Sequence, residues 1–180
     1  LVVLGGDGTL SVASKLFEMG LPVVGIPKTI DNDIRGTDYT IGFQTAVEIA
    51  TQALDRIRTT AESHHRVMLL EVMGRNAGWI AVYAGMANGA DAILIPDIPL
   101  DDEKLDDLCK NLLARKARGA NFSIIAVAEG TILRGKTVAW EFFDGAGEQP
   151  RAKYGGVAAQ LAEIIEKRTK LETGVSSLGY

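Results

Sequence analysis

The chain has 180 residues, of which 47% are apolar and 23% charged, an ordinary composition for a soluble globular protein. Its net charge of −4 argues against general binding to nucleic acid or to a membrane surface. No apolar run approaches the ~18 residues of a membrane-spanning helix, and the single cysteine, Cys109, cannot form an internal disulfide, which fits a cytoplasmic protein.

Short apolar runs alternate along the chain with stretches of helical periodicity. The runs predict strands at residues 1–4, 23–26, 67–72, 92–95 and 122–128. The periodic stretches predict helices at residues 10–17, 43–58, 79–86, 101–118 and 157–170, whereas residues 131–153 read as irregular. Trp79, Tyr83 and Met86 recur at helical spacing and are predicted to lie in the core. This β-α-β alternation predicts an α/β fold of parallel sheets covered by helices.

Four segments rich in glycine or in reactive side chains follow the predicted strands. They are residues 5–9 (GGDGT), residues 27–33 (PKTIDND), residues 73–78 (MGRNAG) and Glu129. Open α/β sheets bind their ligands at the carboxyl ends of the strands, and each segment lies at such an end. The four segments are therefore predicted to contribute to ligand binding.

The GGDGT segment opens a predicted helix. Its glycines let the backbone approach a phosphate closely, and amides at a helix start can bind the anion. Asp7 is a candidate Mg²⁺ ligand, because this hard cation favours carboxylate, water and phosphate oxygens. The segment lacks the Gly-Lys-Ser/Thr ending of a P-loop, and a plain tight turn with a capping aspartate is the alternative interpretation.

The PKTIDND segment places Asp31 and Asp33 two residues apart. Asp and Asn also cap and bend the backbone, so a simple turn is one interpretation. The other is catalytic: one carboxylate takes a proton from a hydroxyl nucleophile, its neighbour orients the reacting groups, and Lys28 stabilises phosphate charge. Arg75 has a similar pair of interpretations, as a surface arginine or as a ligand of a transferring phosphoryl group.

In order and spacing, these motifs resemble one family, the phosphofructokinases. The resemblance rests on GGDGT, PKTIDNDIRGTDYTIGF, EVMGRNAGW, AEG and the final LGY, and it is weakest at residues 130–170. GGDGT alone also fits NAD kinases and diacylglycerol kinases, but TIDND counts against both. The resemblance implies a two-lobed fold, with residues 1–42 in an incomplete nucleotide-binding lobe and residues 43–180 in a sugar-phosphate-binding lobe.

The resemblance also implies a reaction, in which Mg-ATP phosphorylates the 1-hydroxyl of fructose 6-phosphate. Asp31 is then the base, with Thr29, Asp33, Lys28 and Arg75 as further catalytic residues. The implied nucleotide ligands are Gly6, Gly8 and Thr9, and Asp7 is the implied magnesium ligand. The implied sugar-phosphate ligands are Arg66, Met73, Gly74, Arg75, Glu129 and Tyr180. Arg66 matches an arginine that reaches a neighbouring subunit, so a homo-oligomer, dimer or tetramer, is expected.

Several positions depart from the usual family pattern. Gly8 favours ATP by leaving space, whereas Lys28 is typical of pyrophosphate-dependent members. Because lysine also occurs there in atypical ATP-dependent members, the resemblance is to an ATP-dependent enzyme of this atypical type. Gly174 stands where a second subunit-crossing arginine is usual. The effector positions retain Arg58 and Asp91 but little of the usual basic cluster, so weak or no activation by nucleoside diphosphates is expected.

Two further hypotheses accompany the kinase. One is the same transfer with pyrophosphate as donor, and the other is a regulatory or structural subunit that keeps the fold without the activity. The chain begins inside an apparent strand, so it resembles an internal segment of a longer protein, and the segment alone is expected to be inactive.

Overall fold

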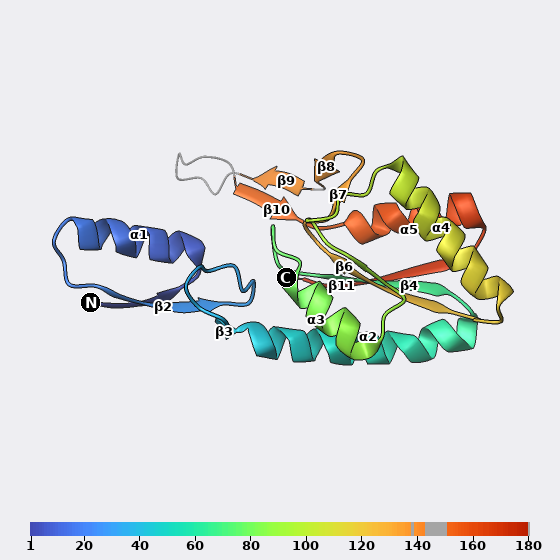
Figure 1. Cartoon of the computed structure of the whole chain (residues 1–180), viewed down its shortest axis with the longest axis horizontal. Coiled ribbons are helices and arrows are strands. Elements are labelled where there is room, and N and C mark those ends of the chain that lie inside the picture. The colour runs from blue at the N-terminus through green and yellow to red at the C-terminus, as the bar shows by residue number, and fades with distance from the viewer. Residues whose placement is uncertain (138, 143–150, 180) are drawn as a thin grey trace.

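The computed structural model describes residues 1–137, 139–142 and 151–179 (Figure 1). The helices are α1 (Asp7–Glu18), α2 (Phe43–His64), α3 (Trp79–Asn88), α4 (Asp102–Ala117) and α5 (Val157–Thr169). The strands are β1 (Val2–Gly5), β2 (Val24–Thr29), β3 (Ile41–Gly42), β4 (Val67–Val72), β5 (Ala92–Leu94), β6 (Ser123–Ala128), β7 (Ile132–Leu133), β8 (Lys136–Thr137), β9 (Ala139–Phe142), β10 (Arg151–Tyr154) and β11 (Thr173–Leu178).

The first sheet has the order β1-β2-β3, and all its strands are parallel. Helix α1 covers one face of this sheet, where Leu10 packs against Gly25 (Figure 1). Val2, Leu4 and Val24 alternate with the covered positions, and their side chains are exposed. Strand β1 ends at Gly5 and strand β2 ends at Thr29, and because the two strands are parallel, the loops that follow them share one edge.

The second sheet has the order β11-β4-β6-β5, and it is also parallel. Helices α2 and α3 cover one face, whereas α4 and α5 cover the other (Figure 1). The two central strands, β4 and β6, are therefore buried on both sides along their whole length. Each fully buried Leu or Ile contributes about 1.5–3 kcal/mol through removal from water. This core makes β4 a rigid support for the loop that follows it.

The fold class predicted from the sequence is confirmed, because parallel sheets covered by helices are present. Three details differ. Helix α2 continues past Arg58 to His64, since Ala61 brings its last turns back to the core. Strand β11 was not predicted, because its residues, TGVSSL, are largely polar and fit a partly exposed edge strand. The region predicted to be irregular contains two short antiparallel strand pairs, β7–β8 and β9–β10.

The prediction that Trp79, Tyr83 and Met86 lie in the core is wrong. Their exposed fractions are 47%, 37% and 71%, because α3 turns its small residues toward the sheet instead. Gly85, for example, lies so close to Ile93 that a Cβ atom would come within 2.8 Å of it. Trp79 packs edge-to-face against Tyr83, and Tyr83 packs edge-to-face against the buried ring of Phe43. Among the described residues, no helix has the length and apolar character needed to cross a membrane.

Candidate active site

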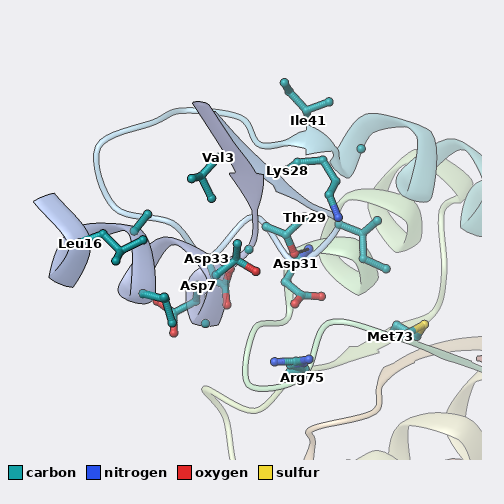
Figure 2. Close-up of a pocket in the computed structure, with 17 residues that line it drawn as sticks. Val3, Asp7, Leu16, Lys28, Thr29, Asp31, Asp33, Ile41, Met73 and Arg75 are labelled. Atoms are coloured by element: carbon teal, nitrogen blue, oxygen red, sulfur yellow. Dashed lines mark hydrogen bonds between the residues drawn. The ribbon is translucent and has the colours of Figure 1, made fainter. Parts of the chain in front are cut away.

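A cavity of about 1080 Å³ lies where α1, the β2–β3 loop and the β4–α3 loop meet (Figure 2). Most of the site residues predicted from the sequence line it: Gly6, Asp7, Gly8, Thr9, Lys28, Thr29, Asp31, Asp33, Met73 and Arg75. Figure 2 shows Asp31 and Arg75 on facing sides of this space. Three of the four predicted loop segments therefore contribute to one cavity.

The GGDGT turn is sterically crowded at its first position and tightly packed at its second. A Cβ atom at Gly5 would lie 2.4 Å from Cβ of Thr9, whose side chain packs against the turn. At Gly6 it would lie 3.3 Å from Cβ of Thr29, so a small residue keeps the two loops close together. Around Gly8, by contrast, no described atom lies within 4 Å of the Cβ position. Packing does not require glycine there, and the space beside the start of α1 is open.

Asp31 is half-buried, and its surroundings disfavour its ionised form. Burial raises the pKa of this carboxyl above its ordinary value, and the neighbouring charge of Asp33 adds to the effect. The positive charge of Arg75 and a hydrogen bond with Thr29 lower the pKa, but they offset the increase only in part. A carboxylate with a raised pKa is a stronger base than an ordinary aspartate, as proton abstraction requires.

We expect Asp31→Asn to raise the thermal midpoint of unfolding of the full-length gene product by a few degrees at pH 7. The pKa of Asp31 is higher in the folded state than in the unfolded state. Its contribution to folding is therefore fully present below the unfolded-state pKa, and it is lost as the pH rises through the folded-state pKa. At pH 7 the ionised, partly desolvated carboxylate therefore opposes folding, and the amide removes this cost. Scanning calorimetry in metal-free buffer between pH 4 and pH 8 tests this. The advantage of the variant should shrink toward low pH, and a midpoint below that of the wild type at pH 7 would contradict the account.

The loop that carries Arg75 is held by Glu129, which directly follows β6. Oε1 of Glu129 accepts hydrogen bonds from the backbone amides of Gly74 (3.1 Å) and Arg75 (2.8 Å). The carbonyl oxygen of Arg75 lies only 1.9 Å from where a Cβ atom of Gly130 would stand. Glu129 is 4% exposed, and burial raises its pKa. Glu129 does not line the cavity, but it anchors the loop between β4 and α3, residues 73–78. We call this loop, which carries Arg75, the arginine loop.

The structure does not bring every predicted residue to the cavity. Arg66 precedes β4, whereas the arginine loop follows it, and a strand of six residues separates the two by roughly 17–20 Å. Arg66 forms an ion pair with Glu172 instead. Gly74 and Glu129 do not line the cavity, and Tyr180 is outside the described residues. Sequence reasoning missed Asn32, Thr40 and Gly130, whose contacts are long-range or involve the backbone.

Gly174 is packed closely against a neighbouring side chain in this chain. It pairs with Met68 across β11 and β4, and a Cβ atom at Gly174 would lie 2.4 Å from the Met68 sulfur. The methionine side chain thus occupies the space that a larger residue at position 174 would need. A side chain at this position would require the flexible end of Met68 to shift.

The two predicted effector-site residues are engaged within the chain. Arg58 donates hydrogen bonds to the carbonyl oxygen (2.7 Å) and side-chain oxygen (2.8 Å) of Asn88 and lies over the ring of Phe122. Asp91 forms a 2.7 Å ion pair with Arg115. Binding of an anionic effector at Arg58 would have to compete with these contacts, so weak activation by nucleoside diphosphates stays our prediction.

The fold and the cavity define an α/β protein of the class that binds ligands at the carboxyl ends of parallel strands. The family model described as Phosphofructokinase matches residues 1–180, and the chain belongs to the phosphofructokinase family.

Individual relatives agree with this assignment. An ATP-dependent 6-phosphofructokinase of Chloroflexus aurantiacus is 48% identical over 100% of this chain and 48% of its own length. A pyrophosphate–fructose 6-phosphate 1-phosphotransferase of Dictyoglomus thermophilum is 46% identical over 100% of this chain and 51% of its own length. A solved phosphofructokinase structure from Saccharomyces cerevisiae matches with a TM-score of 0.77 and 32% identity, covering 99% of this chain and 24% of that one. The chain thus spans about half the length of the curated relatives it matches.

Proposed function

We propose that the chain supplies part of the active site of a cytoplasmic 6-phosphofructokinase, which transfers a phosphoryl group from Mg-ATP to the 1-hydroxyl of fructose 6-phosphate. The observation that carries this proposal is the arrangement of Asp31 and Arg75 around one cavity, beside the glycine turn that opens α1. Membership of the phosphofructokinase family supports the same reaction. The retention of Asp31 and Arg75 argues against a regulatory subunit that lacks activity.

Asp31 is the general base in this proposal. Its carboxylate takes the proton of the sugar 1-hydroxyl while that oxygen attacks the γ-phosphorus of ATP. The bond from this phosphorus to the β–γ bridging oxygen breaks, and ADP leaves with the electron pair. Phosphoryl transfer depends mainly on positioning and electrostatic stabilisation, which Arg75 and Lys28 provide at the phosphoryl oxygens. Thr29 and Asp33 orient the reacting groups beside Asp31.

The start of α1 suits a nucleotide phosphate and its metal ion. Gly6, Gly8 and Thr9 border the cavity, and the helix start offers amides and a positive dipole end to an anion. Asp7 would hold Mg²⁺, which neutralises phosphate charge during transfer. In the described part of the chain no group of three or more acidic, His or Cys residues forms a metal cage. A single carboxylate together with phosphate oxygens and water matches the usual coordination of Mg²⁺.

The phosphoryl donor is ATP in this proposal, and pyrophosphate is the second candidate. The open space around Gly8 leaves room for a nucleotide. Lys28 lines the same cavity and favours the second candidate, as does the name of the relative from Dictyoglomus thermophilum. Steric space discriminates more firmly than one added charge, so we favour ATP.

In this proposal Met73, Arg75 and Tyr180 contact the sugar phosphate, whereas Glu129 acts indirectly by holding the backbone of Gly74 and Arg75. Arg66 serves the site of a neighbouring subunit in a dimer or tetramer, because it lies at the far end of β4 from the arginine loop. Its Nε atom is buried without a hydrogen-bond partner among the described residues.

Product analysis tests the proposal. The full-length gene product is incubated with Mg-ATP and fructose 6-phosphate, and the products are identified by ³¹P NMR. We expect ADP and fructose 1,6-bisphosphate in equal amounts. ATP hydrolysis without sugar phosphorylation, or phosphorylation at another hydroxyl, would contradict it.

A further inference from the structure

Asn32 lies between the two carboxylates of the TIDND segment, yet it belongs to a different set of contacts. Asp31 and Asp33 line the cavity, whereas Asn32 does not (Figure 2). Its backbone has a φ of 53°, in the left-handed region that asparagine tolerates better than most side chains. A backbone in this unusual conformation needs support from its surroundings.

That support comes from Thr40, eight residues further along the chain. The side-chain oxygen of Asn32 accepts a 2.9 Å hydrogen bond from the backbone amide of Thr40. The Thr40 hydroxyl donates a 2.7 Å hydrogen bond to the carbonyl oxygen of Thr29. A hydroxyl has one proton, so its 3.4 Å contact with the Asn32 oxygen is secondary. We name this arrangement of Thr29, Asn32 and Thr40 the Thr40 bracket.

The Thr40 bracket holds the chain on both sides of Asp31. Thr29 and Asn32 flank Asp31, and both are tied to the same buried threonine, which is 4% exposed. Asn32 also donates a 3.4 Å hydrogen bond to the carbonyl oxygen of Asp38. Within the loop, the amide of Asp31 donates to the Thr29 hydroxyl at 3.2 Å. The backbone on both sides of Asp31 is therefore held by the side chains of Asn32 and Thr40, which do not line the cavity.

We propose that Asn32 is a positioning residue which, through Thr40, holds the Asp31 carboxylate in reach of the sugar hydroxyl. This inference rests on the proposed phosphoryl transfer and extends it. Asp31 and Asp33 repel each other, so a loop without the bracket relaxes by moving them apart. A displacement of about 1 Å at a reacting group costs roughly 100-fold in rate, whereas the groups that bind the substrate stay in place.

Matched variants of the full-length gene product test this inference. Asn32→Gly removes the side-chain amide but keeps the left-handed backbone accessible. Thr40→Val removes the hydroxyl at nearly constant shape, and Thr40→Ser keeps it. We expect Asn32→Gly and Thr40→Val to lower kcat about 10- to 100-fold, with KM for ATP and fructose 6-phosphate changed less than about twofold. Thr40→Ser should keep kcat within about threefold of the wild type.

The outcomes separate this inference from the proposed function. A wild type that transfers no phosphate overturns the proposed function and this inference with it. An active wild type together with a folded Asn32→Gly variant of normal kcat overturns the inference alone. If Asn32→Gly does not fold, the threonine pair decides, and equal kcat values for Thr40→Val and Thr40→Ser overturn it. A rise in KM at constant kcat in Asn32→Gly or in Thr40→Val also overturns the inference.

Discussion

Replacing Asp31 with Asn is expected to lower kcat of the full-length gene product about 10²- to 10⁴-fold, the usual contribution of a general base. The amide keeps the size and hydrogen-bonding reach of the side chain but cannot accept the hydroxyl proton. KM for fructose 6-phosphate should change little, because the sugar phosphate is proposed to be bound mainly by other residues. Steady-state kinetics at saturating Mg-ATP measures both constants.

Asp38→Asn provides a matched control for this prediction. Asp38 lies on the same loop, but its side chain is exposed and outside the cavity, so its replacement should leave kcat unchanged. The Asp31 variant is also expected to unfold at a higher temperature than the wild type at pH 7. A more stable but inactive variant would show that the loss comes from chemistry rather than from misfolding. Equal turnover by the two variants would remove Asp31 from the mechanism.

Replacing Gly130 with Ala is expected to damage stability and catalysis together. The new methyl group would lie 1.9 Å from the carbonyl oxygen of Arg75, and backbone cannot move aside as a flexible side chain can. Overpacking of this kind costs about 1–3 kcal/mol of folding free energy. The arginine loop must shift to relieve the clash, so we also expect a loss of kcat of about 100-fold.

Chemical denaturation and steady-state kinetics on the same samples test this second prediction. The expected pattern is a lower denaturation midpoint with an unchanged m-value, together with the lower kcat. A variant with the wild-type midpoint and wild-type kcat would mean that the loop accommodates a side chain at this position. In that case Gly130 would have no part in placing Arg75.

The sequence predicts those strands and helices whose burial is visible in the local pattern of residues. Strands β4 and β6 are continuous apolar runs because both of their faces are buried, and such runs are visible without a structure. Strand β11 escaped prediction because an edge strand needs few apolar residues. The helical spacing of Trp79 and Tyr83 predicts a place in the core, but both side chains are exposed. Helix α3 buries Ala81, Ala84 and Gly85 instead, because it packs closely on the sheet.

In the candidate site, too, local patterns reveal some residues, whereas contacts between distant segments stay hidden. Asp31 and Arg75 could be named from the sequence because each follows a predicted strand, and parallel strands bring such loops to one edge. The supporting contacts could not be named. Glu129 holds an amide 54 residues away, and Gly130 is restricted by a backbone oxygen rather than by a side chain. Contacts of this kind depend on the register between β4 and β6, which local patterns do not reveal.

The central claim, phosphoryl transfer to fructose 6-phosphate, is tested most directly by one coupled assay. The full-length gene product is assayed with fructose 6-phosphate and Mg²⁺, and the initial rate of fructose 1,6-bisphosphate formation is compared with ATP and with pyrophosphate as donor. We predict turnover with both substrates present and a much larger kcat/KM for ATP, in keeping with the open space at Gly8. A preference for pyrophosphate would reverse the choice of donor, and no bisphosphate formation with either donor would contradict the proposed function.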